Sequence, residues 1–442
     1  MDQQELRQWE ARCIQEEAPQ CQAACPLHVD VRAFTKLLAE RRVDKAWTVL
    51  ARTMPLPGVL ARLCEGPCLD ACIRAEAGGS ICVPALERYC AQNAKPAKPP
   101  RPMRGNGKAA AVMGEGLTAL TAAWELARRG FATTLYAPVP GAPLTDLPAD
   151  VLPPEVLAHE LEAMAALGVD TVTDAALDAA LLERLLAEAD AVFVDGLTVP
   201  EALRPAEGPD PVSLGTGRER LFAGPGPGGP EEGSCILQAA VGRRAANSVE
   251  RFTQGVSLVS GREKEGPYPT RLYTSLADVA PEPPLFQDPV SGPVDGEKDA
   301  AAEAARCIQC ECMECVKVCK YLEHYGHYPK VYVRQIYNNE SIVMGTRQAN
   351  TMINSCMLCG LCTTVCPEDF EMAEVCLEAR RSMVRRGKMP PSAHEFALRD
   401  MAFANGEHCA LARHAPDTHA SDYAFFPRSE ERRVGKECAT GC

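Results

Sequence analysis

The run Cys356-Met-Leu-Cys359-Gly-Leu-Cys362-Thr-Thr-Val-Cys366-Pro367 sets the architecture of this chain. Its C-x2-C-x2-C-x3-C-P spacing is typical of cysteines that bind a [4Fe–4S] cluster. Thiolates two residues apart in a tight loop reach neighbouring corners of one iron cube. The fourth, which comes later and precedes proline, turns towards a second cluster. A partner run of cysteines is therefore expected elsewhere in the chain.

The partner run lies upstream and offers five thiols, one more than a four-iron site needs; they are Cys307, Cys310, Cys312, Cys315 and Cys319. An alternative set uses Cys312 in place of Cys307 or Cys310, and the sequence leaves this choice open. Zinc and structural disulfides are competing interpretations, but zinc sites rarely use such a packed double run. Our preferred sets are Cys307, Cys310, Cys315 and Cys366 for one cluster, and Cys356, Cys359, Cys362 and Cys319 for the other.

Composition restricts the class of protein. The chain has 442 residues, enough for several domains, and 22 cysteines. Its first residues are polar and acidic and no apolar run would span a bilayer, so we expect neither export nor a transmembrane segment. Clustered cysteines in a reducing cytoplasm are ligands before they are disulfides, which predicts a cytoplasmic protein. A net charge of -13 and few aromatic residues argue against nucleic-acid binding.

The N-terminal part repeats the cluster motif. Residues 12–15 and 306–309 share the sequence Arg-Cys-Ile-Gln, which indicates two copies of one cradle. Glu16 stands where the second copy has Cys310. Because a carboxylate is a weaker ligand than a thiolate for a soft metal, the first copy predicts a labile cluster, an oxygen-ligated cluster or no cluster. Residues 29–52, which follow, are predicted to form one helix with an apolar stripe.

A second N-terminal group has three cysteines at intervals of four residues, followed by Leu86-Glu87-Arg88. The whole order resembles the N-terminal two-cluster domain of the glutamate synthase small subunit, which is shared with dihydropyrimidine dehydrogenase. The resemblance implies two ligand sets. These are Cys13, Glu16, Cys21 and Cys72 for one cluster, and Cys25, Cys64, Cys68 and Glu87 for the other.

The central part carries a dinucleotide fingerprint. A strand, Gly114-x-Gly116-x-x-Ala119, a helix and a second strand follow one another. Gly114 would form the turn, and Gly116 would let a pyrophosphate approach the backbone. Two features oppose this function: no acidic residue follows the second strand at Tyr136, and Glu115 places a negative charge in the loop. A nucleotide fold that has lost its ligand is therefore the alternative.

A second segment of the central part, at residues 221–226, resembles the closing FAD motif of pyridine nucleotide-disulfide oxidoreductases and includes Gly224. In that family an aspartate follows the glycines, whereas Pro225 or Gly226 stands here. No second glycine fingerprint lies between Gly116 and Phe222, so a separate NAD(P)H domain is not expected. FAD is the cofactor that the resemblance implies for this region.

The C-terminal cysteine runs resemble the helical two-cluster domains of heterodisulfide reductase small subunits. The whole chain resembles a fused pyridine nucleotide-disulfide oxidoreductase and dicluster-binding protein. This implies a multidomain α + α/β fold, with helical ferredoxin-type domains flanking a Rossmann-like FAD/NAD(P)-type domain. The expected divisions are a two-cluster domain at 1–91, a linker at 92–107, a degenerate Rossmann-like domain at 108–260, a linker at 261–299, a dicluster domain at 300–400, the start of a further domain at 401–427 and a non-native tail at 428–442.

The function expected from these motifs is electron transfer by an oxidoreductase component. It would have two C-terminal [4Fe–4S] clusters, one or two N-terminal clusters and FAD, and it would exchange electrons with a redox partner protein. One alternative is an NAD(P)H-dependent electron donor like the glutamate synthase small subunit. Another is a non-catalytic scaffold whose clusters only stabilise the fold. The sequence indicates neither the substrate nor the oligomeric state.

Overall fold

The computed structural model describes residues 2–95, 103–341, 349–387, 395–409, 414, 417–420 and 422. They form two compact units, which are treated separately below. The large unit consists of Arg7–Lys330 and Leu361–Phe370, and the small unit of Met1–Leu6, Val331–Gly360 and Glu371–Cys442. The tail predicted at 428–442 lies outside the described residues, as do residues 410–413, 415, 416, 421 and 423–427 of the segment predicted at 401–427.

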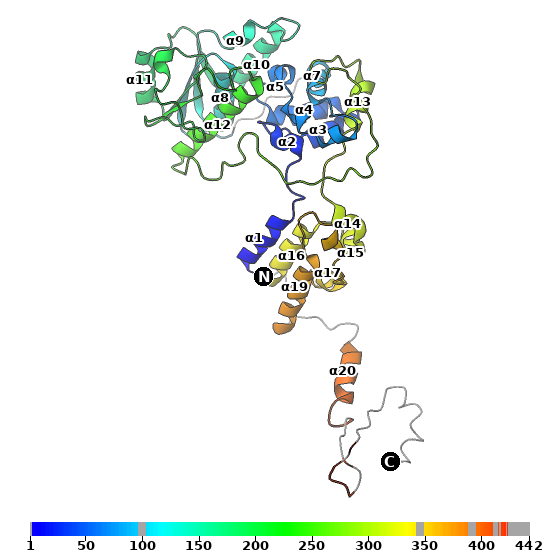
Figure 1. The fold of residues 1–442 in the computed structure, drawn as a ribbon. Helices are drawn as coiled ribbons and strands as arrows, with labels where there is room; N and C mark the ends of the chain where they lie inside the picture. The colour runs from blue at the N-terminus through cyan, green and yellow to red at the C-terminus, as the bar shows by residue number, and fades with distance from the viewer. Residues whose placement is uncertain are drawn as a thin grey trace. The chain divides into compact units, whose positions relative to one another are not determined.

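Short helices form the N-terminal part of the large unit (Figure 1). Asp30 caps one of them, since its side chain accepts a hydrogen bond from the Ala33 N–H at 3.1 Å. The single helix predicted over residues 29–52 is wrong, because Arg41 adopts a positive φ of 57° and divides it into α3 and α4. The elements are α1 (Gln3–Arg12, which begins in the small unit), α2 (Gln20–Ala24), α3 (Val31–Ala39), α4 (Val43–Thr53), α5 (Pro57–Leu63), α6 (Pro67–Asp70), a 3-10 helix (Ile73–Ala77) and α7 (Val83–Asn93).

A five-stranded parallel sheet follows in the chain. Its strand order is β3-β2-β1-β4-β5, an order found in doubly wound α/β folds. β1 is central: Ala109 pairs in register with Ala132 of β2, and Ala110 with Ala191 of β4. The strands are β1 (Ala109–Met113), β2 (Ala132–Tyr136), β3 (Val169–Val172), β4 (Ala191–Val194) and β5 (Leu221–Ala223).

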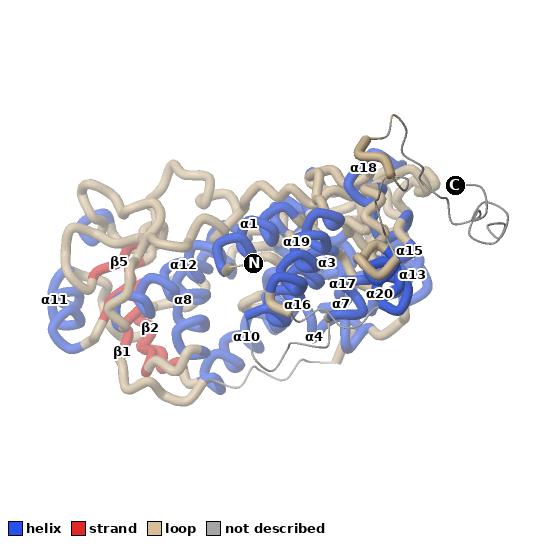
Figure 2. The backbone as a smooth tube through the Cα atoms, turned by 90° about the horizontal axis from the view of Figure 1, so that it is seen from below, coloured by secondary structure: helices blue, strands red, loops and turns tan. Residues whose placement is uncertain are grey.

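Helices cover both faces of this sheet (Figure 2). Because side chains alternate along a strand, Val112 of β1 packs with α8, α10 and α12, whereas Met113 packs on the opposite face with α11. α8 and α12 approach closely, since a Cβ at Gly242 would lie 2.5 Å from the Thr118 carbonyl oxygen. The helices are α8 (Leu117–Arg128), α9 (Ala142–Thr145), α10 (Pro154–Leu167), α11 (Ala179–Glu188), a 3-10 helix (Glu201–Leu203) and α12 (Cys235–Thr253).

Helix α13 (Glu297–Ala305) returns the chain to the N-terminal helices and packs against α3 and α7. The buried Glu303 carboxylate accepts the Cys82 N–H at 3.0 Å and pairs with Arg306 at 2.6 Å. Arg306 also donates to the carbonyl oxygens of Gly79 and Ser80, at 2.8 and 3.2 Å. These contacts fix the start of the cysteine run at residues 307–319 beside the N-terminal helices. The large unit ends with α14 (Glu314–Val318), α15 (Lys320–Tyr325) and α18 (Leu361–Thr364).

The small unit is helical in its described residues. Arg380 of α19 donates to the Ile353 carbonyl oxygen at 2.8 Å and also to that of Cys356. The Asn339 amide donates to Asn350 Oδ1 at 3.1 Å, and both side chains are buried. Neither unit contains, in its described residues, a helix whose length and apolar character would let it cross a membrane. The elements are α16 (Pro329–Ser341, which begins in the large unit), α17 (Asn350–Ser355), α19 (Met372–Arg385) and α20 (Glu395–Ala404).

Candidate metal centres

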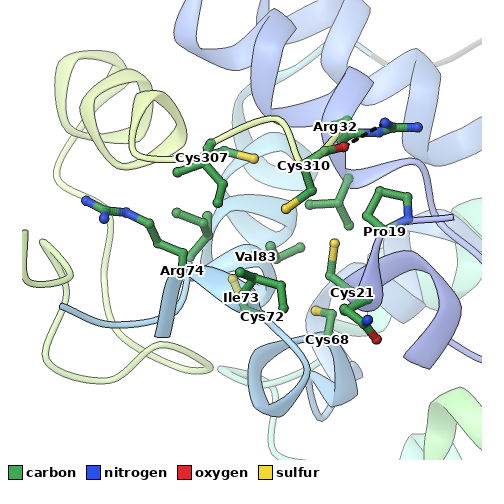
Figure 3. Close-up of a pocket in the computed structure, with 14 residues that line it drawn as sticks. Pro19, Cys21, Arg32, Cys68, Cys72, Ile73, Arg74, Val83, Cys307 and Cys310 are labelled. Atoms are coloured by element: carbon green, nitrogen blue, oxygen red, sulfur yellow. Dashed lines mark hydrogen bonds between the residues drawn. The ribbon is translucent and has the colours of Figure 1, made fainter. Parts of the chain in front are cut away.

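The first group of thiols, called group A here, consists of Cys21, Cys72, Cys307 and Cys310. All four line one cavity, which Cys68 also borders (Figure 3). Cys21 lies on α2 and Cys72 follows α6, while the other two lie in the loop after α13. Burial raises the pKa of the Cys21 thiol, and the charges of Cys72, Cys310 and Cys307 raise that pKa further. Residues more than 230 positions apart in the sequence are thus neighbours here.

Two hydrogen bonds with α3 hold the loop that carries Cys307 and Cys310. Arg32 Nη1 donates to the Cys310 carbonyl oxygen at 2.9 Å. Gln309 Nε2 donates to the hydroxyl of the buried Thr35 at 3.1 Å. Gln309 itself has a positive φ of 53°, which turns the backbone between the two cysteines. Contacts of the protein chain alone therefore position these thiols.

Group B consists of Cys25, Cys64, Cys68 and Glu87, which are all buried. Burial raises the pKa of each of the three thiols, and the charge of Glu87 raises each pKa further. Burial also raises the pKa of Glu87 to about 8. Its Oε2 atom has no hydrogen-bond partner among the described residues. A buried carboxyl oxygen without a partner is costly, so this donor set fits a metal cluster that would bind it.

Group C consists of Cys13, Cys312, Cys315 and Cys366. Burial is the main cause that raises the pKa of Cys312 to about 11 and that of Cys315 to about 12, with smaller contributions from Cys366 and Cys13. Helices α14 and α18 pack together, which places Cys315 near the segment that leads to Cys366. Gln15 Oε1 accepts the Cys312 N–H at 2.5 Å and so ties this run to the N-terminal copy of the motif.

Glu16 has other partners in the structure. Its Oε1 atom accepts a hydrogen bond from the Tyr328 hydroxyl at 2.9 Å, and its Oε2 atom lies 3.3 Å from Lys330 Nζ. The neighbouring Cys13 thiol has its pKa raised mainly by burial, with Cys366 also raising it and Lys330 lowering it. The structure thus places Cys13 and Cys21, which the resemblance assigns to one cluster, beside different thiols.

The remaining predicted set combines residues of both units. Cys319 and Cys362 belong to the large unit, whereas Cys356 and Cys359 belong to the small unit, so this set stays a prediction from spacing. Within the small unit, a hydrogen bond from the Cys376 side chain is the main cause that lowers the pKa of Cys356 to about 6, with smaller contributions from the Leu358 N–H and the Arg380 charge. A lowered thiol pKa favours the thiolate, which is the form that binds metal.

The described residues contain no group of three or more His, Cys, Asp or Glu side chains that would hold a single metal ion. A [4Fe–4S] cluster makes a different demand, because each of its ligands binds a separate iron atom. Its ligands therefore surround a space wider than one ion. The cavity of group A, with cysteines on several sides, has this arrangement.

The predicted nucleotide loop connects β1 to α8. Gly114 has a φ of 142°, as the tight turn requires. The N–H groups of Glu115 and Gly116 both donate to Thr198 Oγ1, at 3.0 and 3.4 Å. Asp195 is 1% exposed, and its Oδ2 atom accepts the Thr198 hydroxyl at 2.8 Å. Side chains of the protein itself, Thr198 and Asp195, therefore occupy the anion-binding loop.

Asp195 is held in the loop as an anion would be. Burial raises its pKa, while hydrogen bonds from Thr198 and from the backbone of Leu197, Gly116 and Ala119 lower it. A Cβ at Gly116 would lie 2.8 Å from Asp195 Oδ2, so no open space faces this glycine. The loop in this state does not fit a pyrophosphate.

Gly224, the third predicted cofactor glycine, lies at the end of β5. Its N–H donates to the Val194 carbonyl oxygen at 2.9 Å, which extends the pairing of β4 and β5. The sequence interpretation missed Asp195 and Thr198. The signal was present, since Asp195 directly follows the buried strand β4, and the carboxyl ends of neighbouring parallel strands meet at one sheet edge.

Two families match the chain, one before the strands of the sheet in the sequence and one after them. The family described as dihydropyrimidine dehydrogenase domain II, 4Fe-4S cluster, matches residues 1–98. The family described as 4Fe-4S dicluster domain matches residues 306–371. The chain carries two iron–sulfur domains. Groups A, B and C draw all their cysteines from these two domains.

Curated relatives are oxidoreductase subunits. The chain is 29% identical over 194 residues to the NADPH-Fe(3+) oxidoreductase subunit beta of Geobacter sulfurreducens, an alignment that covers 41% of this chain and 29% of the relative. It is 28% identical over 203 residues to the NADP(+)-dependent formate dehydrogenase subunit beta of Moorella thermoacetica, covering 39% and 29%. It is 31% identical over 134 residues to the glutamate synthase [NADPH] small chain of Azospirillum brasilense, covering 28% and 27%.

The chain therefore spans less than a third of the length of these relatives. It combines two iron–sulfur domains with a parallel α/β sheet, and it is similar to subunits of pyridine nucleotide-linked oxidoreductases.

Proposed function

We propose that this chain is the electron-transfer component of an oxidoreductase and that it passes electrons one at a time through [4Fe–4S] clusters. The observation that carries the proposal is group B. The charge of Glu87 acts on three buried thiols, and its own buried Oε2 atom has no partner among the described residues. All four residues lie in a segment matched by an iron–sulfur family. Such a site favours a bound metal cluster over an empty core.

The protein contributes the ligands and the environment of each cluster. Thiolates bind the iron atoms, while burial and nearby N–H groups set the reduction potential. In this proposal the helical iron–sulfur domains flank a Rossmann-like domain, which the strand order of the sheet supports. The central domain then serves as a scaffold between cluster domains, because its phosphate loop is filled by Asp195 and Thr198.

A partner protein is part of this proposal. Two of the relatives described above are named as beta subunits, which supports an assembly in which another subunit exchanges electrons with this chain. Each cluster would accept one electron from a reduced partner and return it to an oxidised one. We place this exchange in the cytoplasm, where clustered cysteines stay reduced.

The test is a redox titration of the anaerobically purified chain, followed by electron paramagnetic resonance (EPR). Reversible reduction by dithionite should give signals of reduced [4Fe–4S] clusters, and the reduced protein should pass electrons to an added acceptor. Clusters that stay silent across the range of [4Fe–4S] potentials, about -700 to +450 mV, would instead support a structural scaffold.

A second candidate is an NAD(P)H-dependent donor, favoured by the similarity to the glutamate synthase small chain. This function requires a nucleotide to reach the central domain, and the loop must then release Asp195. Flavin in the purified protein, together with reduction of the clusters by NADPH alone, would establish it. A flavin-free protein whose clusters respond only to dithionite would rule it out.

A further inference from the structure

We propose that Cys21, Cys72, Cys307 and Cys310 hold one [4Fe–4S] cluster, so that the second cysteine run completes a site of the N-terminal helices. The inference rests on the proposed cluster function and names the ligands of one of its sites. It replaces the set that the resemblance implies for Cys21, which includes Cys13 and Glu16.

The cavity gives the first argument. The four thiols of group A line one enclosed space together with apolar side chains, among them Val31, Ile73, Ile81 and Val83. In Figure 3 the sulfur atoms of Cys21 and Cys310 face each other across this space, and that of Cys307 points towards it. Cys68 also borders the cavity but interacts with Glu87, Cys64 and Cys25 of group B. The four thiols that remain match the ligand number of a cubane cluster, and the apolar lining matches its surroundings.

The anchoring of α13 gives the second argument. The Cys307 loop is held by Arg32 and Gln309, and α13 is held by the buried pair of Glu303 and Arg306. Arg306 also donates to the Glu282 carbonyl oxygen at 2.9 Å and to that of Gly79 at 2.8 Å. The Arg306 side chain is 7% exposed and donates to several carbonyl groups, which fixes the position of the loop. Cys307 is therefore brought to α2 by packing that does not involve the thiols.

The environment of the first motif copy gives the third argument. Glu16 has both carboxylate oxygens engaged, by Tyr328 and by Lys330. Gln15, two residues after Cys13, accepts the Cys312 N–H, and Cys13 interacts electrostatically with Cys366 of group C. The two Arg-Cys-Ile-Gln copies have therefore exchanged sites. The second copy contributes its cysteines to group A, with Cys21 of α2, and the first copy contributes Cys13 to group C. The exchange explains why residue 16 need not be a cysteine, since Cys310 supplies that ligand.

The experiment compares two double variants of the full chain, purified anaerobically. The first is Cys21→Ala with Cys310→Ala, and the second is Cys21→Ala with Cys13→Ala. Iron is counted per chain. EPR of oxidised samples detects any three-iron cluster that forms when one ligand, and with it one iron atom, is lost. Cys235→Ala is the matched control, because Cys235 lies at the start of α12, outside all three groups.

With four clusters, the wild type and the control hold about sixteen irons. If group A is one site, the Cys21/Cys310 variant loses one cluster and keeps about twelve irons without a three-iron signal. The Cys13/Cys21 variant then damages two clusters and keeps about eight irons, or about fourteen with three-iron signals. The reversed pattern would overturn the ligand set. Should the first variant fail to fold, the second alone decides between the two patterns.

The same data separate this inference from the proposed function. A wild type with little iron would contradict the cluster function itself. A wild type with about sixteen irons and the reversed pattern would leave that function intact and overturn only the ligands of group A.

Discussion

Group B and the nucleotide loop are both sites that the sequence predicts, and each has a buried carboxylate. The two carboxylates differ in whether the protein itself supplies their hydrogen-bond partners. In group B, the buried Glu87 keeps an oxygen without a partner among the described residues. In the loop, the buried Asp195 accepts several hydrogen bonds, and Thr198 takes the N–H groups that would bind phosphate. One site has unused binding capacity, and the other has none.

The difference shows what a motif can and cannot specify. Glycine spacing fixes the shape of the loop after β1, and the observed turn at Gly114 follows from it. Occupancy depends on residue 195, about eighty positions away in the sequence. Because an anion site is satisfied equally well by an internal carboxylate, a correct loop does not by itself imply a ligand.

The largest expected effect concerns cluster removal. Removing iron with a chelator under reducing conditions should leave the thiols of groups A, B and C without the iron atoms that hold them together. Because ligand binding and folding are coupled in such sites, the melting temperature should fall by roughly 10 °C or more. Differential scanning calorimetry before and after removal measures this change. An unchanged melting temperature would show that the helices fold independently of the clusters.

The second prediction concerns Glu87. Glu87→Ala removes the oxygen ligand that we propose for group B, so the chain should lose between about one and about four irons. Glu160→Ala is the matched control, since Glu160 is also a buried carboxylate but accepts the Gly58 N–H, and it should keep all iron. Iron analysis of both variants gives the answer. Equal iron in the two would mean that Glu87 is not a ligand.

The third prediction concerns Asp195. Asp195→Ala should leave the iron content unchanged but cost about 1–3 kcal/mol in unfolding free energy, because loop N–H groups and Thr198 lose their partner. The opened loop should also bind inorganic pyrophosphate more tightly than the wild type does. Urea unfolding and isothermal titration calorimetry measure the two effects. Asp178→Ala, which removes the cap of α11, is a control for stability loss without binding.

If the wild-type loop already binds pyrophosphate as tightly as the Asp195→Ala variant does, the carboxylate does not block the site. The contrast between the loop and group B would then disappear.

The smallest expected effect is a pH dependence. Burial raises the pKa of Glu160 to about 6, although the Gly58 N–H and the charges of His159 and Arg62 lower it. The folded state therefore holds a proton that the unfolded state releases near pH 4.5. This group's contribution to stability is full below pH 4.5 and falls by about 2 kcal/mol as pH rises through 6.

Glu160→Gln removes the titrating group, so the variant should gain stability relative to the wild type between pH 4.5 and pH 7. Urea unfolding at several pH values measures the difference between the two proteins. A constant difference across this range would show that Glu160 stays ionised in the folded protein.

Local pattern was enough for part of the fold. Strand β1, the turn at Gly114 and α8 follow from the apolar run and the glycines, and the α/β class with a parallel sheet is confirmed. The break at Arg41 was missed because the apolar stripe continues from α3 into α4 on both sides of it. Apolar periodicity reports which residues are buried, but it does not show where the backbone reverses.

The arrangement of thiols was not accessible from spacing. Cys307 and Cys310 belong to a continuous run, and nothing in that run shows that its first half packs against α3. The cause is the long-range packing of α13 through Glu303 and Arg306. The motifs predict which cysteines bind iron, whereas the grouping of those cysteines depends on tertiary contacts.

The most direct test of the central claim is native mass spectrometry of the anaerobically purified chain, which counts bound clusters one by one. The account predicts a mass for the chain plus four [4Fe–4S] clusters, about sixteen irons, that loses clusters as whole units on stepwise activation. A chain that carries zinc ions, or no metal at all, would contradict it.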